Sequence, residues 1–384
     1  MFSSRTNWNL GANRLSEALA RHRASGRPLL DLTVSNPTEC GFAYDASILS
    51  ALVNPAALSY SPDARGLEIA RVAVSDYYAA RGDCVAPGDI FLTTSTSEAY
   101  SFVFRLLCDA GDEILVPAPS YPLFDYLAEM SDVKLVRYPL VFDHGWQIDF
   151  HELERAITAR TRGVIVVHPN NPTGHFCKVV EIARLNEICA RASLAIIADE
   201  VFLDFSLSGE RVAGFAGNLP TLTFTLSGIS KICGLPQMKA AWLAVSGSAD
   251  LKRAAIERLE VIADTFLSMN APVQLALPSF LELRYEFQRR LMARVRANLA
   301  ALDELLAAHT TCSRLEFEGG WYAVLRVPAM RSDEELAIEL LTSRDVYVHP
   351  GHFFDFPGDG HLVASLLAPE NIFSEAISQA ISFF

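Results

Sequence analysis

From residue 89 onward the chain alternates short, almost continuously apolar runs with longer stretches of helical periodicity. Such runs are typical of strands whose sheet is covered on both faces, and their alternation with helices indicates βαβ crossovers and a mostly parallel sheet. The pattern therefore predicts an α/β fold with a large domain built on a seven-stranded, mostly parallel sheet between helices. The predicted strands are Asp89–Thr93, Glu113–Ala118, Lys134–Tyr138, Gly163–Val167, Leu194–Ala198, Thr221–Leu226 and Ala241–Ser246.

The segments outside this alternation predict a second, smaller α+β domain. Helical periodicity marks residues 11–24, 67–80, about 279–306 and about 332–343, and a closing helix is expected from Pro369-Glu370. A strand is predicted at Trp321–Val327, with two short strands after the fourth helix. We expect residues 1–45 to be an N-terminal segment associated with the small domain, residues 46–278 to be the large domain, and residues 279–384 the small one.

Composition narrows the class of protein. The 384 residues are 51% hydrophobic and 20% charged, which is typical of an ordered globular chain of about two domains. The net charge of −13 argues against nucleic acid as a partner. Seven scattered cysteines without a CxxC pair indicate reduced thiols, and neither a signal peptide nor a membrane-length apolar run is present, so we expect a cytoplasmic protein without a membrane partner.

The most informative stretch is Thr221 to Leu243, in which a Ser/Gly turn presents Lys231 between two buried strands. A desolvated lysine amine can attack a carbonyl and hold it as a Schiff base, and the serine hydroxyls and turn amides beside it suit a phosphate. Together they suggest pyridoxal phosphate, which carries an aldehyde and a phosphate. Most lysines at strand ends are merely solvated, so other segments must supply the remaining contacts.

Four further segments lie at the carboxyl ends of predicted strands, where ligands gather in such sheets. Ser95 and Glu98 have capping-box spacing at a helix N-terminus, which is either an ordinary cap or a phosphate seat. Tyr121 could stack on a cofactor ring or simply occupy a turn. The rigid loop His168 to Gly174 could present amide groups to a ring oxygen. Asp199, at the end of a buried strand, needs a cationic partner such as a pyridinium nitrogen unless it is solvated.

Taken in order, these motifs resemble the class I/II aminotransferases of the fold type I pyridoxal-phosphate superfamily (aspartate-aminotransferase-like) over roughly residues 30 to 365. They are Tyr60 to Gly66, Ser95-Thr-Ser-Glu98, Pro119-Ser-Tyr-Pro122, Asn170-Asn-Pro-Thr-Gly174, Asp199-Glu200 and Ser227-Gly-Ile-Ser-Lys231.

The resemblance implies a role for each matched residue. Lys231 would form the Schiff base and shuttle a proton, Asp199 would pair with the ring nitrogen, Asn171 with the ring hydroxyl oxygen, and Tyr121 would stack on the ring. The phosphate would be bound by Ser95, Thr96, Ser97, Ser227, Ser230 and Lys239. Tyr60 would reach the phosphate of a neighbouring subunit, which implies a homodimer with shared active sites.

Three positions depart from the family pattern. Phe202 stands where a tyrosine usually hydrogen-bonds the ring oxygen, and Lys239 replaces an arginine, which removes its bidentate fork. The arginine expected to bind the substrate α-carboxylate near Ser365 is replaced by Val363 or Ala364.

The predicted function is a pyridoxal-phosphate-dependent aminotransferase, which moves an amino group from a donor to a carbonyl acceptor by a ping-pong mechanism. The missing arginine keeps open another reaction on the same fold, namely β-elimination, carbon–carbon bond formation or oxidative chemistry. Arg65 and Arg284 are candidate substitutes for it. His349-Pro-Gly-His352 lacks accompanying ligands, and we expect no metal site. A cofactor-sensing regulator would need a DNA-binding module, for which the residues before 30 are too few.

Overall fold

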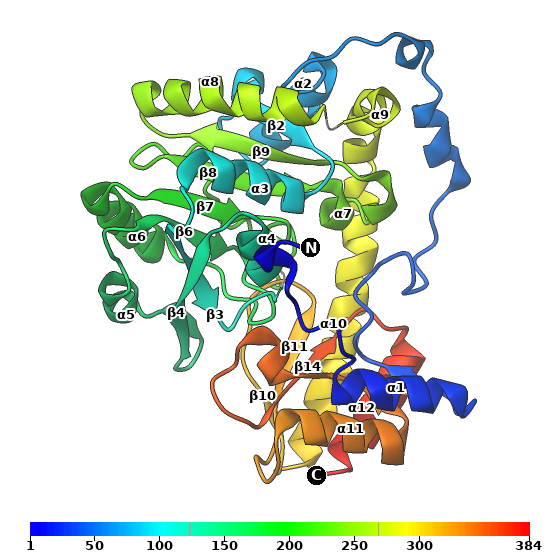
Figure 1. Ribbon diagram of the computed structural model, residues 1–384. Coiled ribbons are helices and arrows are strands. Elements are labelled where there is room, and N and C mark those ends of the chain that lie inside the picture. The colour runs from blue at the N-terminus through cyan, green and yellow to red at the C-terminus, as the bar shows by residue number, and fades with distance from the viewer. Residues whose placement is uncertain (123, 268) are drawn as a thin grey trace.

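A mixed eight-stranded sheet forms the centre of the larger part of the molecule (Figure 1). The structure is a computed structural model that describes residues 1–122, 124–267 and 269–384. The strand order is β2-β9-β8-β7-β6-β3-β4-β5, in which β4, β3, β6, β7 and β8 pair in parallel and the other pairings are antiparallel. The strands are Ile90–Thr93 (β2), Glu113–Ala118 (β3), Lys134–Phe142 (β4), Trp146–Ile148 (β5), Thr161–Val167 (β6), Ala195–Asp199 (β7), Thr223–Gly228 (β8) and Ala241–Ser246 (β9).

All seven predicted strands are present, and the prediction of seven is corrected to eight by β5. This strand has only three residues and pairs antiparallel with the end of β4. The turn between them includes His144 at φ 50° and Gly145 at φ 130°. A three-residue run at the edge of a sheet is too short to give a periodic signal, so the hydrophobic pattern could not identify it.

Alternate residues of the central strands face opposite helical layers. On β3, Ile114 and Val116 pack with α3, α4 and α8, whereas Leu115 packs on the other face with α6. Helices α2 and α9 cover that second face beside β2 and β9. This two-sided burial explains why the strands are apolar throughout. The helices are α2 (Glu68–Ala80), α3 (Thr96–Leu107), α4 (Phe124–Met130), α5 (Phe150–Arg155), α6 (Val179–Ala192), α7 (Ile229–Ile232), α8 (Ala249–Phe266) and α9 (Ala271–Glu282).

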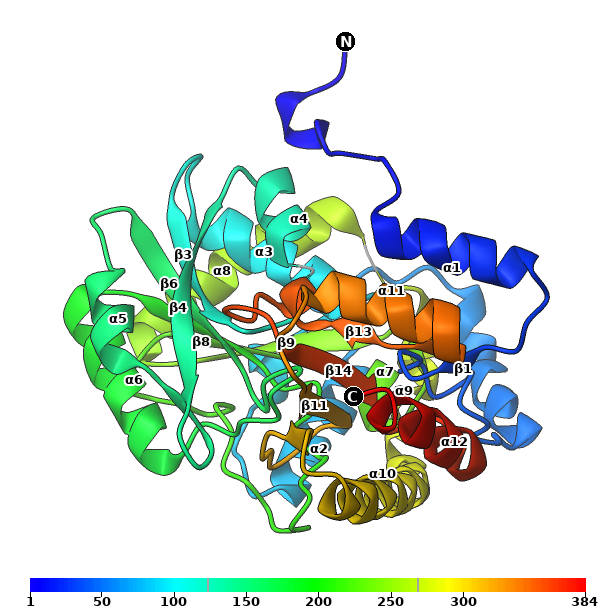
Figure 2. The same ribbon diagram turned by 90° about the horizontal axis from the view of Figure 1, so that it is seen from below.

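A second layer system lies at the far end of the long helix α10 (Arg284–Ala308), as Figure 1 shows. Its antiparallel sheet has the order β10-β11-β14-β13 and packs with α11 and α12, while α1 lies against α11. The pair β1-β12 brings the N-terminal segment to the same region, and Figure 2 shows the first residues projecting away from it. The elements are α1 (Arg14–Ala24), β1 (Leu30–Asp31), β10 (Ser313–Arg314), β11 (Tyr322–Arg326), α11 (Asp333–Arg344), β12 (Val346–Tyr347), β13 (His349–Pro350), β14 (His361–Ser365) and α12 (Glu370–Ile381).

The helix expected over about 279–306 is corrected to two helices. The first, α9, begins at Ala271 and ends at Glu282, and α10 follows after Leu283. Helical periodicity continues across this boundary, so it could not reveal the break. The domain limits after residues 45 and 278 stay a prediction. In the described parts of the chain, no helix combines the length and hydropathy needed to cross a bilayer.

Candidate active site

Lys231 lies on the short helix α7, directly after the end of β8. Glycine is required at position 228, because a Cβ there would lie 2.9 Å from the carbonyl oxygen of Ala240. The Lys231 ammonium nitrogen lies 5.2 Å from the ring centroid of Trp321 and 5.5 Å from that of Phe202. Burial among these rings lowers the pKa of Lys231 to about 8, although the charge of Asp199 acts in the opposite direction. The amine is therefore much more nucleophilic near neutral pH than a solvated lysine.

Asp199 ends β7 and points its carboxylate into the same cavity. Its Oδ2 accepts a hydrogen bond of 3.0 Å from the Tyr100 hydroxyl, and its Oδ1 accepts one of 3.2 Å from the Val201 amide. Burial raises the pKa of Asp199 to about 6, while these hydrogen bonds and Lys231 lower it. A cation bound beside Asp199 would stabilise the carboxylate form, because opposite charges favour ionisation.

The N-terminus of α3 supplies the hydroxyl side of the cavity. Ser95 is the N-cap, and its side chain accepts from the Glu98 amide at 3.1 Å, as the capping-box spacing predicts. The Glu98 carboxylate instead accepts from the Thr94 amide at 2.7 Å. Free amides and hydroxyls at the start of a helix of this length suit an anion such as a phosphate.

The cavity has a volume of about 200 Å³ and gathers most of the predicted site. Asn171 is buried, and its Oδ1 has no hydrogen-bond partner among the described residues. Tyr121 is 43% exposed at the opening. The loops that carry these two residues are joined by Asn170, whose side chain donates to the Pro119 carbonyl at 2.9 Å and accepts from the Ser120 hydroxyl at 3.1 Å. The predicted residues that line the cavity are Ser95, Thr96, Ser97, Tyr121, Asn171, Asp199, Phe202, Ser230 and Lys231.

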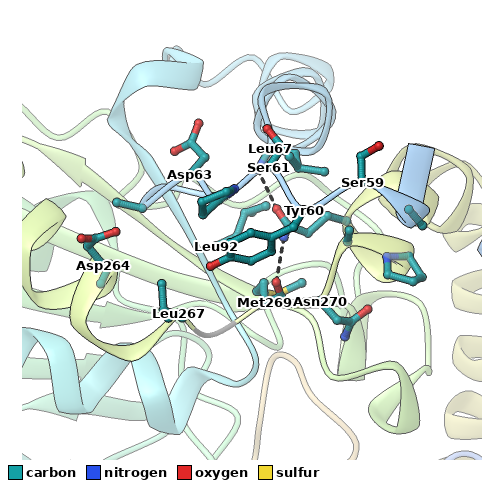
Figure 3. A pocket seen from close by; sticks show the side chains of 18 of the residues that line it. Ser59, Tyr60, Ser61, Asp63, Leu67, Leu92, Asp264, Leu267, Met269 and Asn270 are labelled. Carbon is teal, nitrogen blue, oxygen red and sulfur yellow. Dashed lines mark hydrogen bonds between the residues drawn. The ribbon is translucent and has the colours of Figure 1, made fainter.

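Three predicted residues lie outside this cavity. Ser227 is buried behind it, with its hydroxyl 3.4 Å from the Glu200 carbonyl. Lys239 is exposed, in a left-handed backbone conformation just before β9. Tyr60 lies in a separate hollow of about 350 Å³, beside Leu92 and the turn at Met269 and Asn270 (Figure 3). Its side chain is 82% exposed and is available to another molecule.

Neither candidate substitute arginine reaches the cavity. Arg65 forms an ion pair with Glu260 at 2.7 Å, and the Arg284 guanidinium stacks 4.0 Å from the centroid of the Tyr285 ring. Val363 and Ala364, where the resemblance predicts the carboxylate-binding arginine, are buried in β14. Among the described residues that line the cavity, Lys231 is the one with a cationic side chain.

Some site residues were not predicted from the sequence. Ser35 follows β1 and reaches the cavity, and Tyr100 on α3 reaches Asp199. From the sequence alone, Trp321-Tyr322 after Gly319-Gly320 could be pocket-wall residues or core aromatics, and Tyr322 does line the cavity. These residues are brought in by packing between segments far apart in the chain, and no local motif marks them. We expected no metal site, yet the ligand atoms of His175, Cys177 and Glu181 lie within 4.8 Å of one another.

That buried group already has a structural explanation. Glu181 accepts from the His175 ring at 2.9 Å, from the Lys178 amide at 2.8 Å and from the Ile148 amide at 2.9 Å. These bonds use both carboxylate oxygens to fix the start of α6. The contacts lower the pKa of Glu181 against the effect of its burial.

The chain is similar to known proteins of one family. Residues 49–372 match the family model described as aminotransferase class I and II. The chain is 28% identical over 379 residues to the glutamate-pyruvate aminotransferase AlaA of Haemophilus influenzae, covering 96% of this chain and 93% of that protein. It is 30% identical over 353 residues to AlaA of Escherichia coli, covering 89% and 86%. The solved structure of an Escherichia coli aminotransferase superposes with a TM-score of 0.87 at 26% identity, covering 100% of this chain and 98% of that one.

Proposed function

The chain belongs to the class I and II aminotransferase family, and from this premise we propose that it uses pyridoxal phosphate held at Lys231 to transfer an amino group. The donor would be a small amine and the acceptor a small carbonyl compound, in a ping-pong reaction. The observation that carries the proposal is the meeting of Lys231 and Asp199 in one cavity with the hydroxyls of the α3 N-terminus. Bound pyridoxal phosphate would supply an electron sink for the carbon that bears the amine.

The residues of the cavity fit this cofactor. Asp199 is buried and needs a cation, which a protonated ring nitrogen would provide. Asn171 is buried, and its Oδ1 atom has no hydrogen-bond partner among the described residues, so the amide can accept a further contact. Ser95, Thr96, Ser97 and Ser230 would bind the phosphate, as the start of a helix commonly does, and Tyr121 would cover the ring.

Each of these residues has a defined task in the proposed reaction. Lys231, with a pKa of about 8, would bind the cofactor when neutral and then move a proton at the substrate carbon. Asp199 would keep the ring nitrogen protonated. Phe202 and Trp321 would exclude water from the lysine amine, because both ring centroids lie within 5.5 Å of its nitrogen. Ser227 would act from behind the cavity by fixing the turn that leads to Lys231.

A homodimer with shared active sites is part of the proposal. Tyr60 lines a hollow that also exposes Leu58 and Leu267, at 91% and 64%. In such a dimer Tyr60 of one copy would contact the phosphate in the other, with Lys239 as a cation nearby. Mixing Lys231→Ala and Tyr60→Ala variants tests this, since hybrid dimers would recover one intact site. If mixing restores no activity above that of the separate variants, sharing is excluded.

A second candidate function is another pyridoxal-phosphate reaction on this fold, favoured by the lack of an arginine among the described cavity residues. Transamination and the alternative reaction are distinguished by adding single amines to the cofactor-loaded protein without an acceptor and recording the absorbance of the cofactor. Conversion of the cofactor to its amino form supports transamination. Consumption of the substrate while the cofactor spectrum returns unchanged would favour the alternative. We further propose a cytoplasmic location, because all seven cysteines are free thiols.

A further inference from the structure

One wall of the Lys231 cavity is built from two hydroxyl groups that the proposed cofactor contacts do not use. Ser35 follows β1, and Tyr322 begins β11, so both come from the layer system around the small sheet. The Phe202 and Tyr322 ring centroids are 6.4 Å apart, which places Tyr322 beside the ring that faces the lysine amine. The wall therefore adjoins the place where an amino donor would react.

Trp321 lies directly behind this wall and carries an unused donor. It is fully buried, at 0% exposure, between Phe202 and Phe205, whose ring centroids are 4.7 and 5.0 Å from its own. Its indole N–H makes no hydrogen bond to any described residue. A buried donor without an acceptor is unfavourable, so it is expected to gain a contact when the site is filled or tightened.

The Ser35 hydroxyl and the Trp321 indole both lie near the phenol of Tyr322. Burial raises the pKa of Tyr322 to about 12, and the nearby Ser35 hydroxyl and Trp321 indole oppose that rise. The phenol therefore stays protonated at neutral pH. Because Tyr322 lines the cavity, its hydroxyl can donate a hydrogen bond to a group bound there.

The charges around the cavity decide which group this wall can accept. Its described lining has one carboxylate, Asp199, and one cation, Lys231. The hollow around Tyr60, which a second copy would contribute, contains Asp63 and Asp264 and no cationic side chain among its described residues. A substrate carboxylate at the wall would be desolvated without a dedicated cation, which is unfavourable, whereas a neutral acceptor needs only hydrogen-bond donors.

We propose that Ser35 and Tyr322, positioned by Trp321, bind a neutral hydrogen-bond acceptor of the amino donor, such as an amide, ester or hydroxyl group. The substrate class is then an amine with a neutral polar group in place of a free α-carboxylate. This inference rests on the proposed function, because it takes the cavity to be the amino-donor site.

Binding of two unreactive analogues tests the wall separately from the chemistry. The cofactor-loaded enzyme is titrated by calorimetry with 3-phenylpropanamide and with 3-phenylpropanoate, which differ only in the polar group. We expect the amide to bind about tenfold more tightly than the carboxylate. Tyr322→Phe and Trp321→Phe should remove most of that preference by weakening the amide alone, whereas Tyr347→Phe, outside the cavity lining, should leave it unchanged.

The proposal is overturned if the carboxylate binds as tightly as the amide, or if Tyr322→Phe weakens both equally. Failure of the proposed function looks different. In that case no amine converts the cofactor of the loaded enzyme, while the amide still binds in a manner that depends on Tyr322.

Discussion

The ionisation of Lys231 in the cofactor-free protein is the sharpest physical prediction of this site. Burial lowers its pKa from an ordinary 10.5 to about 8, a change of about 2.5 units or roughly 3.4 kcal/mol at 1.36 kcal/mol per unit. At pH 7 about a tenth of the molecules would then have a neutral Lys231 amine. For a solvated lysine the fraction would be about one in 3000.

Asp199→Asn is the informative perturbation, because the Asp199 carboxylate raises the pKa of Lys231. At pH 8 this carboxylate is ionised, since its own pKa is about 6. Removing its charge should lower the Lys231 midpoint further below 8, by about one unit for a nearby opposite charge. The change isolates the electrostatic contribution, because asparagine has nearly the same shape as aspartate.

The assay is carbon-13 reductive methylation of the cofactor-free protein, followed by a pH titration of the lysine methyl signals. The chain has few lysines to resolve, at positions 134, 178, 231, 239 and 252, and Lys231→Arg assigns the signal. Asp264→Asn, an exposed acid in the separate Tyr60 hollow, serves as the control and should not move the midpoint. A midpoint near 10.5 in the unaltered protein would refute the desolvation argument. A midpoint that rises in Asp199→Asn would refute the electrostatic one.

Three further predictions concern other residues. Phe202→Tyr adds a phenol that can hydrogen-bond the cofactor's ring oxygen, so the Schiff base of the loaded protein should deprotonate at a pH lower by about 1 to 2 units. An absorbance titration that shows no change in this midpoint would contradict the prediction. Phe202→Leu serves as the control for loss of the aromatic ring. Lys239→Ala should weaken pyridoxal phosphate binding several-fold, and Lys239→Arg should preserve or strengthen it through a bidentate contact. Equilibrium dialysis measures both affinities. Equal affinity in the two variants and the unaltered protein would show that Lys239 does not bind the phosphate. Burial lowers the pKa of His168 from 6.5 to about 3, so below pH 6.5 the unfolded state binds more protons than the folded state, and the free energy of unfolding decreases as the pH is lowered. Between pH 7 and pH 5 this should lower the free energy of unfolding, measured with urea, by about 2 kcal/mol. The His168→Asn variant should lack this decrease, and equal decreases in the two proteins would contradict the prediction.

The large sheet could be read from the sequence because each central strand is buried on both faces and is therefore apolar throughout. Val164 to Val167 in β6 and Ile196 to Ala198 in β7 are examples. The edge strand β5 was not predicted, because three residues are too few to show a hydrophobic period. The break between α9 and α10 at Leu283 was not predicted, because the helical periodicity continues across it. The local hydrophobic pattern therefore predicts long helices and buried strands, but not short edge strands or breaks between consecutive helices.

The site residues likewise include some that the sequence predicts and some that it does not. Lys231, Asp199 and Ser95 follow strands of the large sheet, so sequence order places them at one edge, and they do line one cavity. Ser35 and Tyr322 arrive from segments nearly three hundred residues apart, through the packing around the small sheet, and no local motif predicts that meeting. Tyr60, which the resemblance assigns to the active site of a neighbouring subunit, is exposed in a separate hollow, and its role there stays a prediction.

The central assignment is Lys231 as the residue that holds the cofactor. The protein is loaded with pyridoxal phosphate, reduced with borohydride, digested and mapped by mass spectrometry. We predict that the reduced cofactor is attached to the peptide containing Lys231 and that Lys231→Ala abolishes the labelling. Attachment chiefly to another of the five lysines, or no attachment at all, would contradict the assignment of the site.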